Sequence, residues 1–244
     1  MGLSSWELLL AVVGALFVGV SKTGVGGVGV LASALFAVLM PAKQSAGFVL
    51  PMLVFGDLVA VASYRRHAVW AHVGRMFPWT AAGILLGWFA MGRIDDRQAK
   101  LLIGTLVLGL TALQVARRHL GTDGAAPGAW FAPVVGVLAG FTTLVANAAG
   151  ALMAVYLLAM RLPKLEFVGT AAVFFLLVNL FKVPFMVNLG LLTTESLSFN
   201  LLLAPAVFLG TLGGRWLLPR LKQRTFEDVT LALGALAGLY LLLK

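Results

Sequence analysis

The stretch SKTGVGGVG at residues 21–29 places four glycines and one lysine inside an otherwise apolar part of the chain. Its Gly24-x-Gly26-x-x-Gly29 spacing matches the glycine pattern of a dinucleotide-binding turn. That turn also needs a preceding strand, a following helix and an acidic residue about 20 residues further on. Here the flanks are long apolar segments, and the next acidic residue is Asp57. The nucleotide match is therefore coincidental, and the glycines need another explanation.

Composition narrows the choice of explanation. Of the 244 residues, 61% are hydrophobic and only 11% are charged, whereas a soluble domain carries roughly 25% charged residues. Mean hydropathy is +1.00, which predicts an integral membrane protein. The first residues lack a basic n-region and a clear cleavage site, so we expect the first apolar segment to be retained.

The same composition excludes several function classes. The chain has no Cys, so disulfides and thiolate metal sites are excluded. Its three histidines lie near arginines in expected loops, and we predict no metal and no cofactor. Enzymatic activity is not expected either, because an intramembrane enzyme needs a nucleophile–base or metal constellation. The net charge of +9 reflects basic residues that flank apolar segments, so the expected partners are a lipid bilayer and a small anion, with no nucleic acid.

Ten apolar stretches follow one another along the chain, at 6–20, 25–40, 45–64, 76–92, 100–116, 130–146, 150–160, 165–187, 199–214 and 226–243. A membrane-spanning helix needs about 20 apolar residues. The pair 6–20 and 25–40 and the pair 130–146 and 150–160 are short, and each is broken by glycines and polar residues. We predict two broken or hairpin helices, with arms that are either re-entrant or fully spanning.

The two halves of the chain align at an offset of 122 residues. This offset superimposes Gly14 on Gly136, Pro41 on Pro163, Gly47 on Gly169, Ser21 on Thr143 and Asp57 on Asn179. The broken segments also coincide. The pattern indicates a duplication, with residues 1–118 as the first transmembrane repeat, 119–129 as a cytoplasmic linker and 130–244 as the second repeat.

Charge indicates how the repeats are oriented. The expected loop 65–75 is strongly basic, while its counterpart near 187–199 contains only Glu195; conversely 215–224 carries four basic residues and its counterpart 93–100 is mixed. Because basic loops face the cytoplasm, we predict two inverted repeats with both termini outside. The expected fold class is an all-α polytopic membrane protein with about five helical segments per repeat and broken helices meeting near mid-membrane, an architecture typical of transporters.

The broken helices supply the candidate site. Non-helical backbone at membrane depth is tolerated only against protein or a water-filled cavity, and helix ends facing such a cavity suit a small anion. The candidate substrate-binding residues are Ser21, Lys22, Thr23, Gly24, Gly26, Thr142, Thr143, Asn147, Asn179 and Lys182. Two other readings stay open: the glycines serve helix packing, or Lys22 snorkels to the interface.

Asp57 is the acidic residue that lies clearly inside an apolar span. We expect it to act as a proton carrier, as the counter-ion of Lys22 or Lys182, or as a structural hydrogen-bonding group. A lone buried charge is too costly to keep without a partner.

Four stretches resemble the sulfite exporter TauE/SafE family: GVSKTGVGGVGVLA (19–32), PAKQSAGFVLPMLVFGDLVAVASYRRHAVW (41–70), GFTTLVANAAGALMAVYLLAM (140–160) and LPKLEFVGTAAVFFLLVNLFKVP (162–184). Two places depart from the family pattern: 25–28 is less glycine-dense, and 148–151 lacks a Gly-Pro-like end. The resemblance implies export of sulfite or small organosulfur anions such as sulfoacetate. It also implies a multi-pass protein of a prokaryotic plasma (inner) membrane.

The function expected from the residues and the resemblance is a secondary transporter that exports a small sulfur-containing anion by alternating access between two repeats. Two alternatives stay open, an anion channel of the same fold and a non-transporting membrane partner subunit. The sequence leaves the substrate, the coupling ion and the oligomeric state undetermined.

Overall fold

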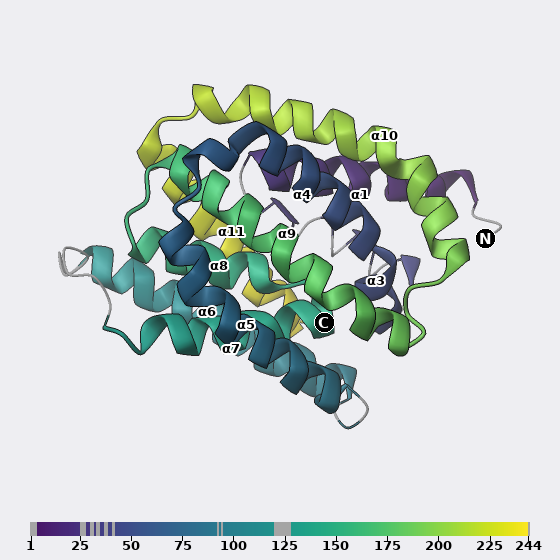
Figure 1. Ribbon diagram of the computed structural model, residues 1–244, viewed down its shortest axis with the longest axis horizontal. Helices are drawn as coiled ribbons and strands as arrows, with labels where there is room; N and C mark the ends of the chain where they lie inside the picture. Colours follow the sequence, from purple (N-terminus) through teal and green to yellow (C-terminus); the bar gives the residue numbers. More distant parts are fainter. Residues whose placement is uncertain are drawn as a thin grey trace.

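The computed structural model describes residues 4–24, 28–29, 32, 35–36, 39–40, 42–91, 93, 95–119 and 128–243. Within these residues every regular element is a helix (Figure 1): α1 (Ser5–Thr23), α3 (Ala42–Phe48), α4 (Leu50–Tyr64), η2 (Arg65–His67), α5 (Trp70–Ala90), α6 (Asp96–His119), α7 (Phe131–Ala146), α8 (Ala149–Ala159), α9 (Lys164–Asn188), α10 (Thr194–Leu217), η4 (Leu218–Arg220) and α11 (Gln223–Leu243). The predicted all-α class is confirmed.

Four helical stretches of the described chain are long and apolar enough to cross a membrane: Ser5–Thr23, Gln44–His67, Lys164–Asn188 and Thr194–Arg220. By contrast α8 has 11 residues and is only about 16 Å long, roughly half of a hydrocarbon core. Tyr156 near its end stacks on Phe131 at the start of α7. The chain therefore reverses between α7 and α8, which form a helical hairpin.

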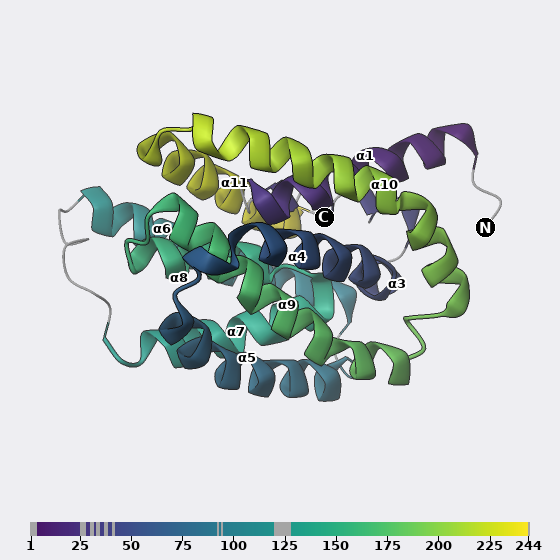
Figure 2. The ribbon, with the colours of Figure 1, turned by 45° about the horizontal axis from the view of Figure 1, so that its top comes forward.

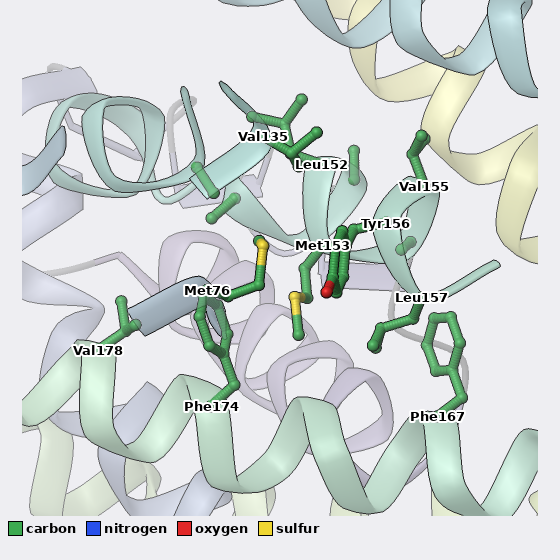
Figure 3. Close-up of a cluster of buried hydrophobic side chains, with 14 of the residues drawn as sticks. Met76, Val135, Leu152, Met153, Val155, Tyr156, Leu157, Phe167, Phe174 and Val178 are labelled. Atoms are coloured by element: carbon green, nitrogen blue, oxygen red, sulfur yellow. The ribbon is translucent and has the colours of Figure 1, made fainter. Parts of the chain in front are cut away.

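Helix pairs build the molecule in layers. The closest pairs are α1 with α10, α5 with α7, α4 with α9, and α6 with α11. Figure 2 shows α4 and α9 between the α1–α10 pair and the α5–α7 pair. The main hydrophobic core draws buried side chains from α5, α7, α8, α9 and α11. Within it, Met153 and Tyr156 of α8 face Phe174 and Phe167 of α9 (Figure 3).

Glycines allow the backbones of two of these pairs to touch. A Cβ added at Gly19 of α1 would collide with the Val207 carbonyl oxygen of α10, and one added at Gly210 would collide with the Leu16 carbonyl oxygen. The α5–α7 pair repeats this arrangement at Gly83 and Gly140. Small residues at such crossings are typical of helix packing in membranes.

The start of α5 corrects one expectation. The segment 65–75 was expected to be a loop, but α5 begins at Trp70. Val73 and Met76 are buried three residues apart on one face, so packing makes this polar segment helical. His72 is consequently a helical residue, with its Nδ1 3.0 Å from the Tyr156 hydroxyl.

Basic residues gather where α4 ends, α9 begins and α10 ends. The Lys164 Nζ donates to the backbone carbonyls of Leu218 and Pro219 at 3.2 Å each. The Val69 N–H donates to the Thr170 hydroxyl oxygen at 2.9 Å. These contacts define a basic end of the molecule, which carries Arg65, Arg66, Arg161, Lys164, Arg215, Arg220, Lys222 and Arg224.

Candidate functional site

A cavity of about 80 Å³ lies between α1, α4, α7, α8 and α9. Because one water needs roughly 10–15 Å³ of cavity, the space holds several waters or one small anion. Residues from both the 1–118 and the 130–244 part of the chain form its wall. The predicted residues that line it are Ser21, Lys22, Gly24, Asp57, Thr143, Asn147 and Asn179.

Lys22 is the cation of this cavity. Its ammonium lies 2.7 Å from Oδ1 of Asp57 and 4.9 Å from the centre of the Phe175 ring. The Lys22 side chain keeps 10% of its surface exposed, whereas Asp57 is fully buried. The expected pairing of Asp57 with a lysine is thus present, and the lysine is Lys22.

Asp57 also joins the two parts of the chain. The Asn179 Nδ2 donates to Asp57 Oδ2 at 2.6 Å, and the two residues are 122 positions apart. These are the positions that the repeat offset superimposes. The carboxylate therefore has one oxygen on Lys22 of α1 and the other on Asn179 of α9.

The break between α7 and α8 supplies hydrogen-bond donors on the opposite wall. Asn147 ends α7 in a left-handed conformation with φ 52°, a conformation that Asn tolerates better than most residues. The first residues of α8 line the cavity, and no side chain of the described residues caps this helix. The first N–H groups of a helix have no intrahelical partner, so the positive end of the α8 dipole lies at the cavity wall.

Lys182 is buried behind the α7 end and does not line the cavity. Its side chain is 0% exposed. The ammonium donates to the Thr143 carbonyl oxygen at 3.1 Å and to the Asn147 Oδ1. The Asn147 Nδ2 in turn donates to the Ala46 carbonyl oxygen at 3.1 Å. Asn147 is thus held between α9 and α3.

Two predicted hydroxyls turn away from the cavity. Thr23 donates to the Thr211 carbonyl oxygen of α10 at 2.7 Å, and Thr142 donates to the Ala139 carbonyl oxygen at 3.2 Å. Both side chains are fully buried. Ser21 does line the cavity, but its hydroxyl donates to the Val18 carbonyl oxygen at 2.7 Å. Gly26 lies outside the described residues.

We expect Thr23→Val to separate packing from the site. The valine removes the hydrogen bond to Thr211, which costs roughly 1 kcal/mol of folding free energy and lowers the melting temperature of the purified protein. Anion flux should stay at the wild-type level, because Thr23 does not face the cavity. Thr23→Ser keeps the hydroxyl and should restore the melting temperature. A large flux loss in a folded Thr23→Val protein would contradict this and assign Thr23 to the binding site.

Sequence reasoning missed the aromatic and apolar part of the wall. Phe175 covers the Lys22 ammonium, and apolar residues of α1, α4, α8 and α9, among them Val18, Leu53 and Met153, line much of the rest of the cavity. Phe175 lies four residues before Asn179, one helical turn away and on the same face. That spacing is the signal that could have found it.

The chain matches a protein-family model along nearly its whole length. The model of the sulfite exporter TauE/SafE family matches residues 10–241. The chain belongs to the sulfite exporter TauE/SafE family. Family membership places it among multi-pass membrane transporters of sulfite and organosulfur anions, and the four apolar helical stretches agree with this. No curated protein and no solved structure matches the chain.

Proposed function

We propose that this TauE/SafE protein is a secondary transporter that binds one small sulfur-containing anion, sulfite or an organosulfonate, between Lys22 and the start of α8. One observation supports this most strongly: a cation from the first part of the chain and an uncapped helix N-terminus from the second face the same cavity. Each favours an anion. The Thr143 and Asn147 side chains complete the polar wall.

Reciprocal contacts support two related repeats, residues 1–118 and 130–244. The pairing of α1 with α10 has its counterpart in α7 with α5, and that of α4 with α10 in α9 with α5. Gly47 packs against Leu191 after α9, and Gly169, 122 positions later, packs against Tyr64 and Ala68 at the end of α4. A two-fold axis relates contacts in this reciprocal way.

The orientation of that axis favours inverted repeats. Equivalent helices pack antiparallel: Gly104 of α6 meets Leu242 and Gly238 of α11, while Gly234 meets Thr111. A two-fold axis between antiparallel spans is perpendicular to them and therefore lies in the membrane plane, as in many secondary transporters. Alternating access would then rock one repeat against the other around the cavity. The Asp57–Asn179 bond crosses between the repeats.

The basic end indicates the direction of the protein in the membrane. We infer that it faces the cytoplasm by the positive-inside rule, which leaves the linker 119–129 inside and both termini outside. Moving an anion out of a negative interior is favoured by roughly 2.3 kcal/mol per charge per 100 mV. The membrane potential alone can therefore drive export in a prokaryotic plasma membrane.

Flux through the purified protein tests this function. Proteoliposomes should take up sulfite or a short alkanesulfonate with saturating rates, and unlabelled anion on the far side should accelerate exchange of labelled anion. Exchange without acceleration and without saturation would indicate a channel. Absence of flux for every anion tried, in protein that is folded, would contradict the proposal.

Substitutions of Asn147 test whether the polar side of the cavity contributes to transport. We expect Asn147→Ala to reduce flux by roughly tenfold or more. The Asn147 carboxamide accepts a charge-assisted hydrogen bond from the Lys182 ammonium, and this bond fixes the backbone between α7 and α8. Asn147→Gly is the matched control, since glycine keeps the left-handed backbone without the amide. Equal losses in the two variants assign the effect to the amide. Wild-type flux in Asn147→Gly would assign it to backbone conformation alone.

A further inference from the structure

Lys182 is a buried cation that is held by neutral oxygens. Its ammonium donates to the carbonyl oxygen of Thr143 at 3.1 Å, to the Thr143 hydroxyl oxygen at 3.5 Å and to Oδ1 of Asn147. Within the described part of the chain, the buried carboxylate of Asp57 pairs with Lys22, and no salt bridge reaches Lys182. A fully buried charge without a counter-ion is costly, so its retention needs a reason.

The three oxygens lie at the C-terminal end of α7. Thr143 is in the last turn of the helix and Asn147 is its cap, so the negative end of the helix dipole points at the Lys182 ammonium. In secondary transporters, the C-terminal ends of broken helices and their unwound carbonyls are places where a coupling cation binds. Here a side chain from α9 brings the positive charge to such a place.

We propose that Lys182 is a tethered cation, whose ammonium group occupies a monovalent-cation site at the end of α7. This inference rests on the proposed transport function for its flux measurement but not for its binding measurement. An ammonium ion is the free ligand of matching chemistry, because it offers the same N–H donors to the same oxygens. A chain that carries its own cation here needs no alkali ion at this position.

The tethered cation also explains how the cavity wall keeps its shape. Asn147 lines the cavity, and its two amide atoms are occupied by Lys182 and by the Ala46 carbonyl. Lys182 is thus a positioning residue that acts on the anion through Asn147 and Thr143. Removal of the Lys182 side chain should empty the cation site and leave Asn147 and Thr143 without their fixed positions. A small cation that binds in the empty site should restore these positions.

Cation rescue of Lys182→Ala tests the proposal. The purified variant is melted in ammonium chloride, sodium chloride and choline chloride at equal concentration, and its flux is measured with the same salt on both sides of the bilayer. Ammonium should raise its melting temperature by roughly 3 °C over choline. Flux should fall by roughly tenfold in choline and recover in ammonium. Sodium measures whether an alkali ion also fits.

Lys182→Met is the matched control, because methionine fills the space without the charge. It should lose flux and show no ammonium effect, and the wild type should be indifferent to the salt. Wild-type melting temperature and flux in Lys182→Met would overturn the proposal. So would equal melting temperatures of Lys182→Ala in all three salts; if that variant does not fold, Lys182→Met decides. A wild type without anion flux contradicts the proposed function, while the melting comparison still judges Lys182.

Discussion

Lys22→Met is expected to abolish anion flux and to destabilise the protein. Lys22 is the cation that lines the cavity, and its ammonium lies 2.7 Å from a carboxylate that is fully buried. Removing one partner of a buried ion pair costs about 3–5 kcal/mol, because the other charge stays buried without compensation. Because Lys22 is the cation among the described residues that line the cavity, its loss should lower flux by roughly 100-fold.

A double variant separates these two effects. Lys22→Met with Asp57→Asn removes both charges, and Asn can still bond to Asn179, so most of the lost folding free energy should return. Flux should not return, because the cavity still lacks its cation. Melting temperatures and proteoliposome flux of the two single variants and the double variant give the coupling directly. Wild-type flux in the double variant would remove Lys22 from the anion site.

Asp57→Asn alone carries a further expectation within this series. The carboxylate competes with an incoming anion for the Lys22 ammonium, so its neutralisation should tighten anion binding, measured as a larger melting-temperature shift at equal anion concentration. Unchanged binding would show that Asp57 and the anion do not share Lys22.

Gly140→Val is expected to prevent stable folding. A Cβ at this position would collide with the Thr80 carbonyl oxygen of α5 and approach Ile84 N at 2.8 Å. Backbone atoms cannot move aside as a flexible side chain can, so the α5–α7 pair must separate. We expect a loss of at least about 3 kcal/mol, the upper end of ordinary overpacking penalties. The yield and melting temperature of the detergent-purified protein measure the effect.

Gly109→Ala is the matched control for this substitution. Gly109 lies in the middle of α6, and a Cβ added there would meet no neighbouring atom. Adding a side chain to this glycine should therefore stabilise the protein by roughly 0.5–1 kcal/mol. Equal melting temperatures for Gly140→Val and the wild type would contradict the assignment of Gly140 to a backbone contact.

Much of the helical layout follows from the apolar pattern. The stretches at 130–146 and 150–160 correspond to α7 and α8, and the interruption between them corresponds to the break at Asn147. The hydropathy pattern shows directly how long each apolar segment is and where it is interrupted, since a span requires about 20 apolar residues. The pattern did not predict the start of α5, because tertiary packing rather than composition makes Trp70 to Arg75 helical.

The pairing of the polar residues was less accessible. Asn179 and Lys182 were both predicted to bind the substrate, yet Asn179 reaches the cavity while Lys182 is turned to the end of α7. Helix α9 is buried over much of its length by neighbours on several sides, so its apolar pattern does not mark a cavity face. Phe175 escaped notice for the same reason.

The sequence by itself determined that this chain is a helical membrane protein with two interrupted segments, and that Lys22, Lys182 and Asp57 lie within its apolar part. Those conclusions depend on composition and on spacing along the chain, which are local properties. Only the tertiary structure decided that Asp57 binds Lys22 and Asn179 rather than Lys182, and that the start of α8 opens onto the same cavity. Such pairings depend on which helices pack together, because partners more than 30 residues apart in the chain meet only through packing.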